Sequence, residues 1–190
     1  MKKILQQQER VLREKADEVK IADIKTVKIK KILKEMSEAL KSQDDGVALA
    51  APQIGYSLRI FVVSGKIFAR NFSRRKSGSA EEELLNQNSL VTETEPEEDR
   101  KDLVFINPVI SKLSKEKEWL PEGCLSVRWL YGHTFRSKKA SVTAYDENGK
   151  KFNRGASGLL AQIFQHETDH LNGVLFTDHA KDVKEELPIK

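Results

Sequence analysis

The chain has 190 residues, 38% of them hydrophobic and 33% charged, which fits one water-soluble domain with a sizeable core. No apolar run approaches the ~20 residues of a membrane-spanning helix, so we expect no membrane partner. Lys and Arg total 33 against 29 Asp and Glu, for a net charge of +4. This mixed surface leaves a ribosome contact as a weak alternative, and we expect no DNA partner. The single cysteine excludes an intramolecular disulfide framework.

The first twenty residues do not read as a targeting segment. Two lysines follow the initial methionine, but the sequence turns polar after Leu5 and has no apolar run followed by a small-residue cleavage site. Glu9, Glu14 and Asp17 argue against an organelle transit peptide. We therefore expect a cytoplasmic location of the bacterial type, with an organelle as the alternative.

Helical periodicity dominates the first forty-odd residues. Apolar side chains recur at roughly helical spacing between lysines and glutamates, at Ile24, Val27, Ile32, Met36 and Leu40. The pattern predicts an N-terminal helix that packs one face on the core and ends near Ser42.

A polar stretch at about residues 69–101 interrupts the apolar pattern. It follows a strand candidate at residues 59–64, and it has eight acidic and no basic residues between Glu81 and Asp99. We expect a mobile surface insertion within a single catalytic domain that spans residues 1–190.

The second half of the chain alternates strand signals with turns and then becomes helical. Residues 103–110 form a strand candidate in which Asn107-Pro108 marks an edge or a bend. Residues 140–152 read as a hairpin, and a helix is expected from near Ser157 to Gly173. Strands followed by a helix, without βαβ alternation, indicate an α+β fold with mainly antiparallel sheets around the C-terminal helix.

The segment QHETDH on that last helix suggests a metal site. His166 and His170 continue the stripe of Leu159 and Ile163, which should face the protein interior. Two unpartnered buried imidazoles would cost a few kcal/mol each, and a shared cation would remove this cost. Glu167 could then act as a base beside the ion. The alternative is a pair of core histidines that bond to neighbouring groups.

A third ligand is harder to find. The position six residues after His170 is Phe176, Glu185 and Glu186 lie in a charged tail, and His179 follows a break in the pattern. Upstream, Cys124 lies in PEGCLS after a glycine that permits close backbone approach. A thiolate with two imidazoles leaves a fourth position open, as a catalytic ion requires.

Three separated segments, taken in order, resemble the peptide deformylase family. They are GVALAAPQ, EGCLS and QHETDHLNG, at residues 46–53, 122–126 and 165–173, with INP before the second and DENGK after it. Any one of them is weak, but the three in order are specific. The resemblance implies a metal-dependent hydrolase that removes the formyl group from the formyl-methionine of nascent polypeptides and releases formate.

The resemblance also implies roles for individual residues. Cys124, His166 and His170 would be the metal ligands, with Fe²⁺ the expected ion in the cell and Zn²⁺, Ni²⁺ or Co²⁺ able to replace it. Glu167 would be the general base and acid. The side-chain amide of Gln53 and the backbone N–H of Leu125 would stabilise the developing oxyanion.

A substrate channel is expected next to these groups, formed by Gly46, Val47, Gly123, Leu159 and Ile163. The chain departs from the family pattern at Ala48, where glycine is usual, and at Arg128, near which proline is usual. These departures bear on side-chain preference rather than on metal chemistry.

Two other functions remain open at this level. A zinc peptidase would share the two histidines and the glutamate, and an inactive or altered-specificity homologue would bind nascent peptide or ribosome without hydrolysis. Gln53, Cys124 and Glu167, all present, argue against an inactive chain.

Overall fold

The computed structural model of the chain describes residues 2–69 and 100–187. The polar insertion expected at about residues 69–101 therefore lies almost wholly outside the described residues.

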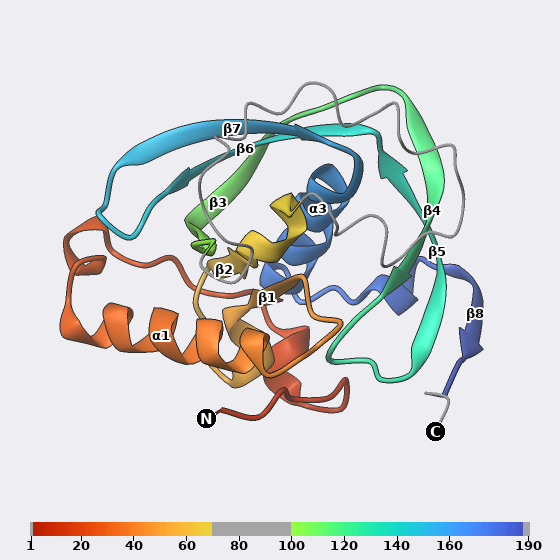
Figure 1. Ribbon diagram of the computed structural model, residues 1–190, viewed down its shortest axis with the longest axis horizontal. Coiled ribbons are helices and arrows are strands. Elements are labelled where there is room, and N and C mark those ends of the chain that lie inside the picture. The colour runs from red at the N-terminus through yellow and green to blue at the C-terminus, as the bar shows by residue number, and fades with distance from the viewer. Residues whose placement is uncertain (1, 70–99, 188–190) are drawn as a thin grey trace.

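Two antiparallel sheets form the framework (Figure 1). The larger sheet has the strand order β1-β2-β3-β6-β7, with the bounds Ala48–Ala50, Ile60–Val63, Leu103–Leu113, Lys139–Tyr145 and Lys151–Ser157. The smaller sheet has the order β4-β5-β8, with the bounds Lys117–Gly123, Leu130–Ser137 and Lys181–Glu185. Short 3-10 helices connect these elements at Arg10–Arg13, Ile21–Asp23, Ala51–Ile54, Gly65–Phe68 and Phe176–Asp178.

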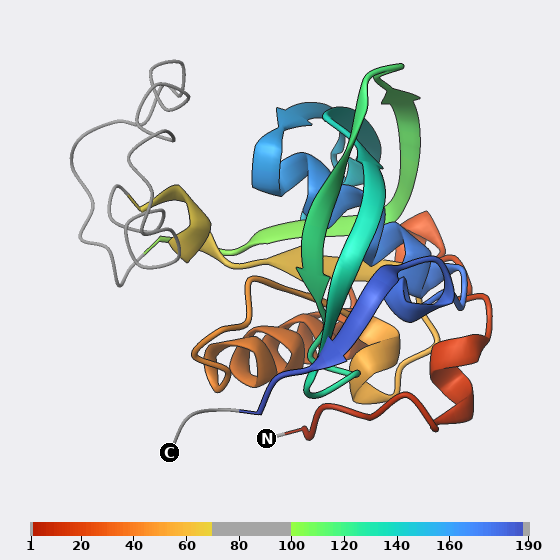
Figure 2. The same ribbon diagram turned by 90° about the vertical axis from the view of Figure 1, so that its right-hand side faces the viewer.

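Helix α3 (Gly158–Leu171) lies in the middle of the molecule, surrounded by strands of both sheets (Figures 1 and 2). Its Phe164 is fully buried against Phe61 of β2 and Phe105 of β3, with ring centroids 6.3 and 5.2 Å away. Phe61 and Phe105 themselves stack at 4.5 Å. This aromatic cluster fixes α3 on the larger sheet, so polar side chains on α3 occupy defined positions in the interior.

Helix α1 (Val27–Lys41) covers the other side of β1 and β2. Thr26 caps its first turn by accepting from the N–H of Ile29. The predicted end near Ser42 is confirmed, because Ser42 is the C-terminal cap. Helical periodicity was expected over the first forty-odd residues, but the helix begins only at Val27, which is 83% exposed, and Ile24 is buried from the turn before it. Apolar spacing alone did not separate this turn from the helix.

Strand β3 lies inside the larger sheet, between β2 and β6, so the prediction of an edge at Asn107-Pro108 was wrong and that of a bend was right. Asn107 has a φ of 51° where the register with β6 shifts. Its side-chain amide accepts from and donates to the backbone of Val19 at 2.8 and 2.7 Å. Pro108 is tolerated inside the sheet because it sits at this bulge, where the ladder is interrupted.

The hairpin β6–β7 and the boundaries of α3 agree with the predictions, and the α+β class with mainly antiparallel sheets is confirmed. Strands β1, β5 and β8 were not predicted. In β5, exposed and buried residues alternate, with Thr134 and Arg136 inside and His133 and Phe135 outside. Strand β5 pairs with β4, and the inner side of this β4–β5 hairpin faces α3 and supplies partners for the site.

Candidate metal centre

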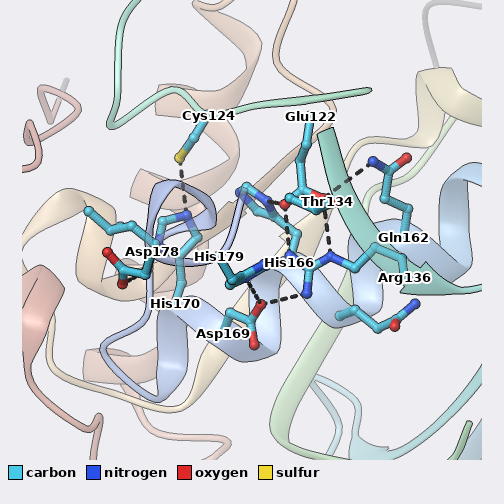
Figure 3. A network of polar contacts seen from close by, with 12 residues as sticks. Glu122, Cys124, Thr134, Arg136, Gln162, His166, Asp169, His170, Asp178 and His179 are labelled. Atoms are coloured by element: carbon cyan, nitrogen blue, oxygen red, sulfur yellow. Dashed lines mark hydrogen bonds and ion pairs between the residues drawn. The ribbon is translucent and has the colours of Figure 1, made fainter. Parts of the chain in front are cut away.

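Three potential metal ligands meet between α3 and the end of β4. His166 and His170 lie one turn apart on α3, and Cys124 follows the last residue of β4. Their ligand atoms all lie within 4.8 Å of one another, and Cys124 Sγ is 3.1 Å from His170 Nε2 (Figure 3). Helical i, i+4 spacing brings the two rings to 4.9 Å between centroids. The structure thus gathers the three residues that the sequence singled out.

This donor set fits a divalent transition-metal ion. One thiolate and two imidazoles are the soft and intermediate ligands that Zn²⁺ and Fe²⁺ accept, and three protein ligands leave a position for a reactant. His170 is 1% exposed, and its Nδ1 has no hydrogen-bond partner among the described residues. The downstream alternative fails, because His179 Nε2 lies 3.4 Å from Asp169 rather than with the other two imidazoles.

Glu122 orients one of the two imidazoles. Its Oε1 lies 2.6 Å from His166 Nδ1, so the opposite ring nitrogen, Nε2, remains for the centre. A carboxylate on the far side of a ligating histidine fixes its tautomer and increases the electron density on the ligating nitrogen. Glu122 is 7% exposed and lies on the inner side of β4, one residue before the glycine that precedes Cys124.

Arg136 and Thr134 of β5 donate hydrogen bonds to the carboxylate of Glu122. Arg136 donates through Nη2 to Oε1 at 2.8 Å and through Nε to Oε2 at 3.1 Å. Thr134 donates its hydroxyl to Oε2 at 2.6 Å. Burial alone would raise the pKa of Glu122, but bonds to His166 and Arg136 outweigh it and hold the pKa far below the ordinary value. Arg136 also reaches Asp169 of α3 at 2.6 Å, which ties β5 to the helix (Figure 3).

The two imidazoles have opposite electrostatic environments. Burial acts to lower the pKa of His166, yet its bonds to Cys124 and Glu122 raise that pKa well above the ordinary value. Burial, followed by the positive charge of His166, lowers the pKa of His170 well below it. Among the described residues, His166 has a carboxylate partner and Nδ1 of His170 has no partner, so the protein holds the two ligand candidates differently.

Glu167 lies beside this group and is 3% exposed. Its Oε2 has no hydrogen-bond partner among the described residues. Burial is the main reason that the pKa of Glu167 is raised, to about 7. A carboxyl group with this pKa can accept and return a proton near neutral pH, which is the property of a general base and acid.

Gln53 has a fixed amide orientation. Its Oε1 accepts from the backbone N–H of Ala50 at 2.8 Å, so Nε2 is the end that faces the centre. That nitrogen donates to Ser126 Oγ at 3.1 Å and lies 3.6 Å from Cys124 Sγ. Gln53 belongs to the 3-10 helix Ala51–Ile54, which follows β1 directly, and its side chain is buried. Its amide nitrogen is therefore a preorganised donor next to the thiol of Cys124.

A pocket of about 350 Å³ opens beside these groups. It is lined by Gln53, Cys124, His166 and Glu167, and by all five residues expected to form a substrate channel: Gly46, Val47, Gly123, Leu159 and Ile163. Leu125, the expected source of a backbone donor, lines the pocket as well. The predicted candidates therefore surround one cavity that can hold a medium-sized apolar side chain.

Several residues of the site were missed at the sequence level. Thr134, Arg136 and Asp169 complete the network around Glu122, and Ser126 accepts from Gln53. Arg136 lies fourteen residues after Glu122, and only the pairing of β4 with β5 brings them together. Two-residue alternation from residue 131 to 137 is the signal that could have predicted β5 and its inward Arg136.

The comparisons with known proteins agree with this geometry. Residues 1–186 match the family described as polypeptide deformylase. The chain belongs to this family. A peptide deformylase 2 of Clostridium acetobutylicum is 32% identical over 178 residues, which cover 94% of each protein. The chloroplastic and mitochondrial peptide deformylase 1A of Arabidopsis thaliana is 38% identical over 168 residues, which cover 88% of this chain but 57% of that relative.

Solved deformylase structures have the same fold. The enzyme of Thermotoga maritima is 31% identical with a TM-score of 0.71, and the alignment covers 95% of this chain and 98% of that one. The Synechococcus elongatus enzyme, solved in complex with actinonin, is 30% identical with a TM-score of 0.70. The alignment covers 94% of this chain and 78% of that one. The chain is thus a peptide deformylase-type hydrolase that acts on nascent formylated peptides and depends on a metal. Within the described ranges, no helix is long and apolar enough to cross a membrane.

Proposed function

We propose that Cys124, His166 and His170 hold a single divalent ion, Fe²⁺ in the cell, and that the surrounding residues use it to hydrolyse the formamide of formyl-methionyl peptides. The observation that carries this proposal is the grouping of the three ligand atoms within 4.8 Å at the wall of the pocket that also holds Gln53 and Glu167. Such an ion, when bound, supplies Lewis acidity toward an oxygen ligand. Zn²⁺, Ni²⁺ and Co²⁺ suit the same donors.

Glu167 moves the proton in this proposal. Its carboxylate takes a proton from the attacking water, and the carboxylic acid then returns that proton to the amine that leaves as the new N-terminus. In the metal-free protein, burial raises the pKa of Glu167 to about 7, so the isolated site is already suited to exchanging a proton near neutral pH. The unpartnered Oε2 is the atom we assign to this transfer.

Gln53 and Leu125 stabilise the charge that develops on the formyl oxygen. The Nε2 of Gln53 is already oriented by the bond from Ala50, so little reorganisation is needed during reaction. Its present acceptor, Ser126 Oγ, is buried, and we expect the substrate oxygen to compete for the amide. The backbone N–H of Leu125 is the second donor.

The pocket explains why the substrate begins with methionine. Val47, Leu159 and Ile163 provide an apolar surface for the side chain, and Gly46 and Gly123 leave backbone groups open to an extended peptide. Adding a Cβ at Gly123 would place it 2.7 Å from the ring of Tyr131, so this glycine leaves the space that the Tyr131 ring occupies.

The cellular setting follows from the substrate. Formyl-methionyl chains exist where translation starts with formyl-methionine, which is the bacterial cytoplasm or an organelle of bacterial descent. We propose the bacterial cytoplasm. Two bacterial relatives support this proposal, since the match to this chain covers 94% and 74% of their length.

The test separates deformylation from peptide-bond hydrolysis. The protein is purified without oxygen, its metal is measured, and formate release from formyl-Met-Ala-Ser is followed together with release of free amino acids. We expect one metal per chain and formate as the product. Amino acid release without formate would favour the zinc peptidase and contradict the proposal.

A further inference from the structure

The outer face of the β4–β5 hairpin has a composition that hydrolysis of a formamide does not require. In β5 the inward side chains support the metal site, whereas His133 and Phe135 are exposed. In β4 the same alternation exposes Lys117 and Trp119 and buries Glu122. Figure 2 shows this hairpin and β8 at the front of the molecule, and no other described element covers them.

Two aromatic rings form the centre of this face. Trp119 and Phe135 are direct cross-strand partners, with ring centroids 5.2 Å apart and planes inclined by 34°. They are 44% and 49% exposed, although either ring alone would gain free energy by burial. An exposed apolar patch rimmed by polar groups marks an interaction site, and these two paired rings form such a patch.

Cations surround the rings. Lys181 Nζ lies 4.5 Å from the centroid of the Trp119 ring, and Lys117 Nζ lies 5.8 Å from that of Phe135. Exposed His133 is paired in register with Lys181. We call Lys117, Trp119, His133, Phe135 and Lys181 the outer aromatic–basic surface.

Carboxylates are directed away from the centre of this surface. Glu116 and Glu118 of the hairpin pair with Lys138, at 2.7 and 3.7 Å. Asp182 and Glu185 lie further along β8, with Lys184 between them, so Lys117 of β4 and Lys181 of β8 are the cations that lie against the rings. The aromatic pair therefore lies in a locally positive environment, within a chain of net charge +4.

We propose that the outer aromatic–basic surface binds single-stranded RNA. Unpaired bases would stack on Trp119 and Phe135, and the phosphates on either side would contact Lys117 and Lys181. Stacking platforms flanked by cations are how proteins hold single strands without reading sequence. A polypeptide lacks the regular negative charge that this arrangement of cations complements, which is why RNA is the preferred occupant.

The test uses the full chain and a fluorescein-labelled twelve-nucleotide oligouridylate, with anisotropy measured at low salt. We expect saturable binding that Trp119→Ala and Phe135→Ala each weaken about tenfold, in line with the contribution of one stacked base. Trp119→Phe is the matched control, since it keeps a ring and should bind nearly as the original chain does. Lys117→Gln with Lys181→Gln should flatten the dependence of log Kd on log salt.

Formate release from formyl-Met-Ala-Ser serves as the folding control, because none of these side chains lines the pocket. Activity should be unchanged in every variant. Three results would overturn the proposal: no binding by a fully active chain, equal affinity of the two alanine variants and the original chain, or equally tight binding of blunt duplex RNA, which offers phosphates but no free bases. A rise in KM for long formyl peptides in the alanine variants, without RNA binding, would assign the surface to polypeptide instead.

Discussion

The carboxylate of Glu122 lies 2.6 Å from Nδ1 of His166 and belongs to a strand whose next residues lead directly to Cys124. One short segment thus supplies a metal-ligand candidate and the group that orients a second one. Arg136 holds this carboxylate from the neighbouring strand, and Asp169 holds Arg136 from α3. The centre is therefore a junction of β4, β5 and α3, and its properties depend on residues that would not touch the ion.

Replacing Glu122 with Gln should weaken metal binding. The neutral amide still fills the space but no longer increases the basicity of His166, and such changes reduce metal affinity about 10- to 100-fold. Competition with a fluorescent chelator measures the affinity. Glu118→Gln on the same strand is the control, because among the described residues the ion-pair partner of Glu118 is Lys138, at 3.7 Å and away from the metal centre. Equal affinities of the two variants would refute the orienting role.

Arg136→Ala should destabilise the protein strongly. The guanidinium is 6% exposed and pairs with both Glu122 and Asp169, so its removal leaves buried negative charge uncompensated. Breaking a buried pair in this way costs about 3–5 kcal/mol. Urea unfolding of the metal-free protein gives the value. A loss below about 1 kcal/mol, the size typical of exposed pairs, would show that the network is well solvated.

Glu167 should make the metal-free protein less stable at high pH. Its pKa is raised in the folded state, to about 7 from 4.5, so the folded chain holds the proton more tightly than the unfolded chain does. The resulting loss of stability is absent below pH 4.5, grows as pH rises to 7, and then stays constant at about 3 kcal/mol. Unfolding of the original chain and of Glu167→Gln is compared from pH 4 to 9. The glutamine variant should lack this decline, and parallel curves would contradict the raised pKa.

Gln53→Ala should reduce kcat by about 10²- to 10³-fold, the effect of removing one oxyanion donor. Metal content should stay at the original level because the amide is not a ligand in this account. Ser126→Ala is the matched control: it removes the other partner of the same amide nitrogen and leaves the donor in place. Steady-state formate release measures both. A loss of metal in Gln53→Ala, or an equal loss of activity in the serine variant, would assign Gln53 a structural role.

Elements that depend on local sequence patterns could be predicted, whereas contacts that depend on long-range strand pairing could not. The stripe of Leu159, Ile163, His166 and His170 predicted α3 and its inward histidines, because helical periodicity is a local property. Its first residue departs from the prediction, since Leu159 is 37% exposed at the pocket. The partners of Glu122 could not be predicted, since they depend on the register of β4 with β5. Local spacing can also mislead: Val27 matches the apolar spacing of α1 and was expected to face the core, but it lies on the exposed side of the helix.

The central claim, that Glu167 moves the proton at a Cys124–His166–His170 metal centre, is tested most directly by Glu167→Ala. Formate release from formyl-Met-Ala-Ser and metal content are measured on the same anaerobic preparation. We predict one metal per chain, as in the original protein, with deformylation reduced to background. Activity that survives in the metal-loaded variant would contradict the account.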